Sequence, residues 1–243
     1  MRLQNKVAII TGSSRGIGAA TAKLFAEEGA KVVVQYKENK TAAEKVFRSL
    51  AGNGHIILRA DVSKENEAVK LVEAVMEKYN RIDILVNNAG EIGQRGWTIN
   101  AKEWQRIIDV NLTSAWLLIR QVAPIMKKQE SGAIVNLSST VARGVAAIMP
   151  YSCAKGGIIS LTAGFAKELA PHIRVNAVAP SNVKTDMTKS AGPELIEFFR
   201  QQTPLKRIAD PEELAKVILF LASNDSSYIT GHRLVVDGGY SLK

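Results

Sequence analysis

Cysteine and histidine are scarce in this sequence. Its 243 residues include one cysteine, Cys153, and three histidines. A single cysteine excludes an intrachain disulfide framework and fits a reducing compartment such as the cytosol. The histidines, His55, His172 and His232, are scattered and form no metal-binding spacing with the cysteine. We therefore expect no bound metal.

Long apolar runs are also missing. No stretch approaches the ~18–20 apolar residues that a membrane-spanning helix requires. Met1 leads almost directly into a strand-like segment, Lys6 to Ile10, which leaves no room for a signal peptide. We expect a cytoplasmic protein with no membrane partner.

Acidic residues are outnumbered by basic ones, and the formal net charge is +9. The lysines and arginines are spread along the chain, and no basic run is interleaved with aromatic residues, so we expect no nucleic-acid partner. Electrostatic steering of a polyanionic small molecule or an acidic carrier protein explains the balance at least as well. A charge that only aids solubility is the remaining interpretation.

Short apolar runs alternate with segments of helical period from one end of the chain to the other. Continuously apolar runs of this kind are typical of strands covered on both faces. The predicted strands are Val7–Ile10, Lys31–Val34, Ile56–Ala60, Ile82–Val86, Ala133–Leu137, Ile173–Val178 and Leu234–Val236. The predicted helices are Ala19–Glu28, Thr41–Leu50, Glu65–Tyr79, Ala101–Lys128, Tyr151–Glu168 and Pro211–Ala222. The alternation predicts an α/β fold, one domain over residues 1–243 with a parallel sheet and right-handed crossovers.

Two irregular segments interrupt the alternation. Residues 91–97 follow the fourth predicted strand, and residues 181–204 follow the sixth. In an open α/β sheet, ligands bind beyond the carboxyl ends of the strands, where both segments fall. We expect them to form walls of a substrate site and the second to act as a mobile lid, although long loops without such a role are the alternative.

A glycine-rich turn joins the first strand to the first helix. Its sequence is TGSSRGIG, from Thr11 to Gly18. Glycines let the backbone approach a pyrophosphate, and the helix N-terminus supplies amide donors. The spacing Gly12-x-x-x-Gly16-x-Gly18 departs from the usual Gly-x-Gly-x-x-Gly, but the strand before and the helix after match the required context. The turn predicts a dinucleotide site.

The end of the second strand indicates which dinucleotide binds. An NAD site needs an acid about 20 residues beyond the glycines, whereas here Gln35, Tyr36 and Lys37 precede the first acid, Glu38. Arg15 and Lys37 could both meet a 2′-phosphate, which favours NADP. The alternative is that both cations are merely solvated.

Two further strand ends carry polar residues. The Asp61 carboxylate could accept a hydrogen bond from the adenine amino group, or it could cap the helix that begins near Ser63. The segment Asn87-Asn88-Ala89-Gly90 could lie against the cofactor ribose or simply tie strands together.

Tyr151 and Lys155 lie four residues apart and so share one face of a predicted helix. An ammonium beside a phenol favours the phenolate, so we expect the pKa of Tyr151 to be lowered towards neutral pH. Upstream, Ser138 ends a strand-like run in hydroxyl groups. A solvated helix face is the alternative for the tyrosine and lysine alone, but together these features predict an acid/base centre.

Taken together, these motifs resemble the short-chain dehydrogenase/reductase family over essentially the whole chain. The matching motifs, in family order, are TGSSRGIG, Asp61-Val62, NNAG at 87–90, Asn111, Ser138, YSCAK at 151–155, NAVAP at 176–180 and VDGG at 236–239. The resemblance implies a Rossmann fold, a doubly wound sheet of seven parallel strands with helices on both faces. It also implies a homotetramer or dimer built through the two helices that carry Asn111 and Tyr151.

The resemblance also implies roles for individual residues. The catalytic set would be Asn111, Ser138, Tyr151 and Lys155: Ser138 polarises the substrate oxygen, Tyr151 protonates it, Lys155 serves the phenol and the ribose, and Asn111 holds a water. Ser139 could replace Ser138, although the interval to Tyr151 favours Ser138. The NADP(H)-binding set would be Gly12, Ser14, Arg15, Gly16, Ile17, Gly18, Tyr36, Lys37, Asp61, Val62, Asn88, Ala89, Gly90, Tyr151, Lys155, Pro180, Val183 and Thr185.

One position departs from the family pattern. Ser181 follows Pro180 where the family often has glycine, which puts the local turn in doubt. Val183 and Thr185 still match the positions that usually hold the nicotinamide carboxamide. Cys153 is expected to be a small core thiol.

The pattern is closest to the 3-oxoacyl-[acyl-carrier-protein] reductases. The implied reaction is NADP(H)-dependent interconversion of a carbonyl and a secondary alcohol. Where those reductases often present a basic residue, this chain has only His172, and fold and catalytic residues do not fix a substrate. A general carbonyl, sugar or steroid-type reductase and a non-catalytic dinucleotide-sensing regulator are the alternatives.

Overall fold

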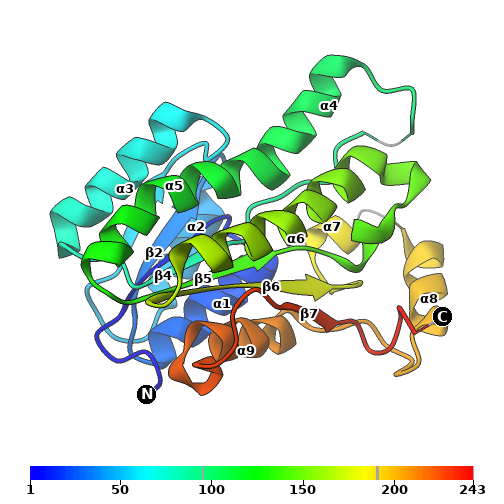
Figure 1. The fold of residues 1–243 in the computed structure, drawn as a ribbon. Coiled ribbons are helices and arrows are strands. Elements are labelled where there is room, and N and C mark those ends of the chain that lie inside the picture. The colour runs from blue at the N-terminus through cyan, green and yellow to red at the C-terminus, as the bar shows by residue number, and fades with distance from the viewer. Residues whose placement is uncertain (95, 190–191, 243) are drawn as a thin grey trace.

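The computed structural model describes residues 1–94, 96–189 and 192–242. One sheet of seven parallel strands forms its centre, in the order β3-β2-β1-β4-β5-β6-β7 (Figure 1). The strands are β1 (Val7–Ile10), β2 (Lys31–Tyr36), β3 (Ile56–Arg59), β4 (Ile84–Asn87), β5 (Gly132–Leu137), β6 (Ile173–Pro180) and β7 (Arg233–Val236). The order reverses direction between β1 and β4, so the predicted doubly wound Rossmann fold is confirmed.

The strand ends differ from the predicted ones by one or two residues. β4 begins at Ile84 rather than Ile82, because the Gln129 side chain binds both the N–H and the C=O of Ile82, at 3.0 and 2.8 Å. β6 continues through Pro180, which pairs with Val236 of β7. Strand pairing in β6 therefore continues two residues beyond Val178, where the apolar pattern predicts the strand to end.

Helices cover both faces of the sheet. The main helices are α1 (Gly16–Glu27), α2 (Lys40–Arg48), α3 (Glu65–Tyr79), α4 (Ala101–Ile108), α5 (Ser114–Lys128), α6 (Met149–Leu169) and α9 (Pro211–Ala222). Residues of α1, α2 and α9 pack in one buried cluster, and residues of α3, α5 and α6 pack in another. In Figure 1, α3 to α6 lie above the sheet and α1 and α9 lie below it.

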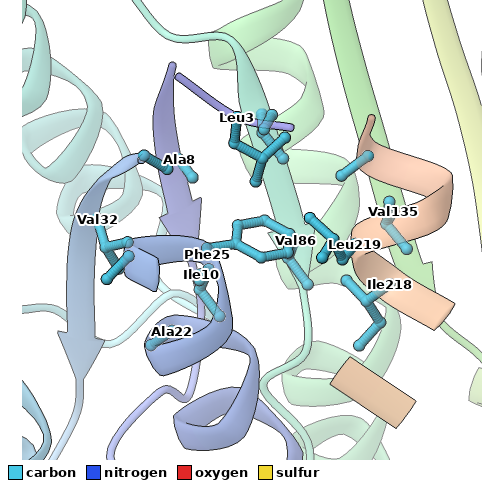
Figure 2. Packing of buried hydrophobic residues seen from close by; sticks show 14 of the residues in the cluster. Leu3, Ala8, Ile10, Ala22, Phe25, Val32, Val86, Val135, Ile218 and Leu219 are labelled. Carbon is cyan, nitrogen blue, oxygen red and sulfur yellow. The ribbon is translucent and has the colours of Figure 1, made fainter. Parts of the chain in front are cut away.

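Alternate residues of each central strand feed the two clusters. In β1, Ala8 and Ile10 join the cluster on the α1 face, whereas Val7 and Ile9 join the other. Phe25 of α1 is fully buried among the residues shown in Figure 2. Burying a side chain of this size contributes about 1.5–3 kcal/mol. Because the sheet is covered twice, its strands read as unbroken apolar runs.

The predicted helix over residues 101–128 is three elements. A π-helical turn, Asp109–Thr113, separates α4 from α5 and holds Asn111 at its centre. Such turns leave backbone groups out of the regular ladder and occur frequently at functional sites. The buried Asn111 amide donates to the Ile107 carbonyl at 2.9 Å, which offsets part of that loss.

The second irregular segment contains two helices that the sequence pattern did not predict. They are α7 (Asp186–Lys189) and α8 (Pro193–Gln202). Short 3-10 turns occur at Thr140–Arg143, Ala146–Ile148 and Asn224–Ser226. Residues 190–191 of the predicted lid and residue 95 of the first insert lie outside the described residues.

The expectation that Cys153 is a core thiol is wrong, because its side chain is exposed. It lies on α6 between the buried residues Ser152 and Ala154. Within the described ranges, no helix is long and apolar enough to cross a membrane. No group of three or more histidine, cysteine or acidic side chains in the same ranges is placed to hold a metal ion.

Candidate active site

A cleft of about 880 Å³ runs along the carboxyl ends of the strands. Its walls come from the segments that follow β1, β2, β3, β4, β5 and β6. Most of the predicted site residues line it: Gly12, Ser14, Arg15, Gly16, Ile17, Tyr36, Lys37, Asp61, Val62, Asn88, Ala89, Gly90, Ser138, Tyr151, Lys155, Pro180 and Thr185. Gly18, Asn111 and Val183 lie behind this lining. One continuous cleft thus holds both the glycine turn and the predicted acid/base centre.

The glycine turn is built for close approach by an anion. Gly12 and Gly16 have φ angles of +63° and +56°, which favour glycine. A Cβ on Gly18 would lie 2.5 Å from both the Asn88 side-chain nitrogen and the Gly12 carbonyl oxygen. Among the described residues, no side chain caps α1 at Arg15 and no acid occupies its first turn. The first amides of α1 therefore remain available, and they fit a dinucleotide pyrophosphate.

Gln35 is a site residue that the motif analysis missed. It is buried in β2, its side-chain oxygen accepts from the Gly12 N–H at 2.8 Å, and its amide donates to the Ala60 carbonyl at 2.6 Å. One side chain thus ties the glycine turn to the end of β3. A polar residue in the middle of an apolar strand was the available signal, because a buried amide needs partners.

Charged residues at the adenosine end of the cleft are paired. Lys37 Nζ lies 3.0 Å from the Asp61 carboxylate, and an Arg15 nitrogen lies 3.8 Å from that of Asp186 on α7. The hydrogen bond from Lys37 to Asp61 is the main cause of the raised pKa of Lys37, acting against burial. The two predicted phosphate-binding cations therefore lie at the cleft, each with a carboxylate beside it.

Asp61 also binds locally. Its other oxygen accepts from the Ser63 N–H at 3.1 Å and the Ser63 hydroxyl at 2.6 Å. This is a turn ahead of α3, which begins at Glu65. Asp61 does not cap that helix, because the N-cap residue is Lys64 and no side-chain hydrogen bond caps α3 there.

The segment after β4 is bound to the glycine turn. Thr11 Oγ accepts from the N–H groups of Asn88 and Ala89, each at 2.9 Å. The Asn88 amide donates to the carbonyls of Thr11 and Gly12, at 2.8 and 3.2 Å. The structural interpretation of this motif is therefore correct for Asn88, which braces the turn against β4.

Asn111 holds the segment that follows Gly90. Its amide nitrogen donates to the Glu91 carbonyl at 2.8 Å, and its oxygen accepts from the Glu91 N–H at 3.2 Å. A Cβ on Gly90 would lie 2.7 Å from that oxygen and 3.5 Å from Lys155 Nζ. A larger residue at position 90 would therefore displace the Asn111 side chain, whereas Lys155 Nζ would stay at ordinary van der Waals distance.

Tyr151 and Lys155 come together as predicted, but the pKa of Tyr151 does not shift as predicted. Lys155 Nζ lies 5.5 Å from the centre of the Tyr151 ring and donates to the Leu137 carbonyl at 2.8 Å. Burial raises the pKa of Tyr151 to about 12 and lowers the pKa of Lys155 to about 8. The expectation of a lowered tyrosine pKa is wrong for this structure, because desolvation of the phenol outweighs its hydrogen bond with Ser139.

The two adjacent serines have different partners from those expected. Ser138 lines the cleft, but its hydroxyl donates to the Lys155 carbonyl at 2.9 Å. The Ser139 hydroxyl hydrogen-bonds with the Tyr151 phenol and donates more weakly to the Pro180 carbonyl at 3.3 Å. Ser139, the alternative, is thus the serine whose hydroxyl contacts the Tyr151 phenol, whereas Ser138 is the one that lines the cleft.

The segment after β6 closes one side of the cleft. The Ser181 hydroxyl donates to the Asp237 carbonyl at 3.3 Å, which holds the turn despite the missing glycine. Val183 is buried and pairs with Ala209, so its side chain belongs to the core rather than to the cleft. Thr185 lines the cleft, and its methyl group would lie 3.2 Å from a Cβ on Gly16. The start of the predicted lid therefore lies directly against the glycine turn.

Comparisons with known proteins agree with this arrangement. A family profile described as "Enoyl-(Acyl carrier protein) reductase" matches residues 12–241. The 3-oxoacyl-[acyl-carrier-protein] reductase FabG of Thermotoga maritima is 43% identical, covering 98% of this chain and 99% of that protein. The 3-oxoacyl-[acyl-carrier-protein] reductase of Synechocystis sp. is also 43% identical, over 98% and 97% of the two chains.

Solved structures of similar chains extend the comparison. Levodione reductase superposes with a TM-score of 0.93 at 34% identity, covering 99% of each chain. A protein described as short-chain dehydrogenase/reductase SDR:glucose/ribitol dehydrogenase, from Brucella melitensis, superposes with a TM-score of 0.94 at 34% identity, covering 100% of this chain and 99% of that one. With its motifs, its sheet and its relatives in agreement from end to end, this chain belongs to the short-chain dehydrogenase/reductase family of oxidoreductases, which use a nicotinamide dinucleotide.

Proposed function

We propose that this protein is an NADPH-dependent reductase of 3-oxoacyl groups carried on an acyl carrier protein. The observation that carries the proposal is the convergence of Tyr151, Lys155 and Ser139 beside a dinucleotide-binding turn. Nearly full-length identity of 40–43% to proteins named 3-oxoacyl-[acyl-carrier-protein] reductase supports the substrate class. The positive net charge of +9 suits an acidic carrier.

The residues suit the reducing direction. When bound, the reduced nicotinamide supplies a hydride to the carbonyl carbon. Tyr151 keeps its proton at neutral pH, because burial holds the pKa of the phenol at about 12, and gives that proton to the substrate oxygen. The Ser139 hydroxyl would release its 3.3 Å bond to the Pro180 carbonyl and donate its one hydrogen to the same substrate oxygen. Lys155, with a pKa of about 8, is mostly protonated at pH 7 and stabilises the phenolate left behind.

Asn111 acts on the shape of the site in this proposal. Its two hydrogen bonds to the Glu91 backbone fix the wall of the cleft next to Lys155. A water held by Asn111 and leading to Lys155 stays part of the proposal, because the Asn111 oxygen lies close to the space beside Lys155 Nζ.

The preference for NADPH is also a proposal. Arg15 and Lys37 both line the adenosine end of the cleft, and β2 carries Tyr36 where an acid would accept from the ribose of NAD. Each cation has a carboxylate beside it, and a bound 2′-phosphate would compete with Asp61 and Asp186 for them. A cytoplasmic site of action and a homotetramer likewise remain proposals.

The test is reduction of an acetoacetyl group on a purified acyl carrier protein, followed as NADPH oxidation. We expect turnover with NADPH and at least a tenfold higher Kd for NADH, which is about 1.4 kcal/mol. A panel of simple ketones, sugars and steroid ketones serves as the comparison. A higher kcat/KM for any member of that panel than for the carrier-bound substrate would contradict the substrate assignment. Equal dissociation constants for the two dinucleotides would contradict the assignment of the cofactor.

A further inference from the structure

An acidic residue, Glu91, lines the cleft in which we propose that the anionic dinucleotide binds. Glu91 directly follows the NNAG motif and lines the dinucleotide cleft together with Lys37. Asn111 clamps its backbone on both sides, at 2.8 and 3.2 Å. The negative charge of Glu91 is also among the smaller causes of the raised pKa of Lys37, after the hydrogen bond to Asp61. The carboxylate therefore acts on the end of the cleft where the 2′-phosphate of NADP is proposed to bind.

Glu91 has a cationic partner that does not itself line the cleft. Arg106, on α4, binds the Glu91 carboxylate through its Nη1 nitrogen. The other edge of the Arg106 guanidinium is held by Glu103, whose oxygens accept from Nε and Nη2, each at 2.8 Å. A bidentate pair of this kind fixes the plane of the guanidinium. Glu103 thus aims the free edge of Arg106 at Glu91.

The same acid fixes the segment that carries Glu91. A Glu103 oxygen accepts from the Gln94 N–H at 2.9 Å. Gly93 packs directly on α4, since a Cβ there would collide with the Ile107 side chain. The position of the Glu91 charge relative to α4 is therefore set by both backbone and side-chain contacts.

From these contacts we infer that Arg106 masks the charge of Glu91 and thereby sets the affinity of the cleft for the phosphorylated dinucleotide. Without Arg106, the Glu91 carboxylate would face the same cleft as the 2′-phosphate with less compensation of its charge, and like charges repel even where, as here, the side chain is partly exposed. NADH lacks that phosphate and should be affected less. Arg106 is a specificity-determining residue that acts through Glu91 without touching the ligand.

The test is a double-mutant cycle read by equilibrium binding, so that it needs no substrate. We expect Arg106→Met to raise the Kd for NADPH about tenfold at low salt and the Kd for NADH less than about threefold. In the Glu91→Gln background, Arg106→Met should change the Kd for NADPH less than about twofold. The tenfold effect should shrink in 0.5–1 M salt, because screening weakens interactions between partly exposed charges.

Three controls separate charge from structure. Arg106→Lys keeps the positive charge and should bind NADPH nearly as wild type does. Glu103→Gln keeps an oxygen for the Gln94 N–H but removes the bidentate pair that orients Arg106, so it should raise the Kd for NADPH less than Arg106→Met does. Arg48→Met removes the same charge from an ion pair with Glu44 on α2, 3.6 Å apart and outside the cleft lining, and should change nothing.

Two outcomes would overturn the inference. One is an equal loss of NADPH binding on Arg106→Met with and without Glu91→Gln, and the other is an equal loss for NADH. Either would mean that Arg106 only holds the segment in place. The inference rests on the proposed preference for NADP. That preference is tested by the ratio of the Kd values for NADH and NADPH in the wild type. The coupling between Arg106 and Glu91 is tested separately, by the double-mutant cycle.

Discussion

The surroundings of Tyr151 keep its phenol protonated at neutral pH. Burial raises the pKa of the phenol to about 12, although the hydrogen bond with Ser139 stabilises the charged form. Burial also lowers the pKa of Lys155 to about 8, so one buried site holds two groups whose charged forms are both disfavoured. Groups perturbed in this way in a cleft are candidates for acid/base work.

Tyr151→Phe keeps the ring and its packing but removes the transferable proton. Folding and dinucleotide binding should survive, and turnover should fall by about 10²–10⁴, the usual worth of a general acid. Steady-state kinetics with any accepted carbonyl, together with a dinucleotide titration of the same preparation, measures both. Turnover near that of the wild type would rule out the mechanism. Lys155→Met, by contrast, should weaken dinucleotide binding as well as turnover.

The two serines supply a matched comparison. Ser139→Ala should lower kcat by about 10²–10³, because it removes the donor beside the Tyr151 phenol. Ser138→Ala removes only the 2.9 Å bond to the Lys155 carbonyl, so it should cost about 1–3 kcal/mol of stability and change kcat far less. Kinetics and urea unfolding of both variants separate the roles. A larger loss of kcat for Ser138→Ala than for Ser139→Ala would instead assign the donor role to Ser138, which the interval to Tyr151 favours.

At the scale of elements, β2 and its neighbours shape the cofactor turn. The Gln35 side chain joins the Gly12 N–H, after β1, to the Ala60 carbonyl, after β3. Asn88, directly after β4, also holds the turn, because its side-chain amide donates to the carbonyls of Thr11 and Gly12. The turn therefore has its shape before any ligand arrives, which lowers the entropic cost of binding.

Gln35→Leu should weaken this arrangement. It leaves the Gly12 N–H and the Ala60 carbonyl without their partner, at about 1–3 kcal/mol for each buried group. We expect lower stability and at least a tenfold higher Kd for the dinucleotide, measured by urea unfolding and by titration. Gln35→Glu keeps an acceptor for the Gly12 N–H and should bind more tightly than Gln35→Leu. If both variants bind as the wild type does, the turn does not depend on Gln35.

The segment after β6 touches the turn from the other side, through Thr185 and Gly16 and through Asp186 and Arg15. We propose that residues 181–204 act as a lid. Their backbone amides should become slower to exchange with deuterium when NADP binds, because the cofactor completes the cleft beneath them. Exchange in α3 serves as the internal reference. Protection that is unchanged in the segment would contradict the proposal.

At the scale of the whole molecule, one surface remains apolar. A shallow hollow of about 310 Å³ on the π-helical turn, α5 and α6 is lined by Leu112, Thr113, Trp116, Gly157 and Leu161. The Trp116 side chain is 39% exposed. Large exposed apolar surfaces mark sites of interaction. This surface agrees with the proposed oligomer, in which these two helices form the contact.

Trp116→Glu should disrupt such an oligomer, because a buried unpaired charge in the contact is costly. We expect sedimentation velocity to show a tetramer or dimer for the wild type and a smaller species for the variant. Asn66→Glu adds the same charge to an exposed position on α3 and should leave the mass unchanged. A wild type that sediments as a monomer would contradict the proposal outright.

The sequence by itself determined the sheet, its seven strands and the location of the site. Runs such as Val7–Ile10 must be buried on both faces, and a parallel sheet with helices on either side is the arrangement that achieves this. The glycine turn and the Tyr151–Lys155 spacing are local features, because a turn or one helical face is formed by residues close in sequence. Local patterns of this kind are readable without a structure.

Only the tertiary structure decided which atoms face one another. Ser138 and Ser139 are adjacent in sequence, but Ser138 is fixed by its N–H bond to Val178 on β6, and its hydroxyl then meets the Lys155 carbonyl. The π-helical turn at Asn111 likewise depends on a segment 20 residues away.

The ion pairs and the burial of individual side chains also depend on the tertiary structure. The pairing of Lys37 with Asp61, the exposure of Cys153 and the raised pKa of Tyr151 all result from neighbours that lie far apart in the sequence or from surrounding burial. Sequence spacing constrains the backbone over a few residues. The partner of a side chain, and the water it loses, depend on the packing of the whole chain.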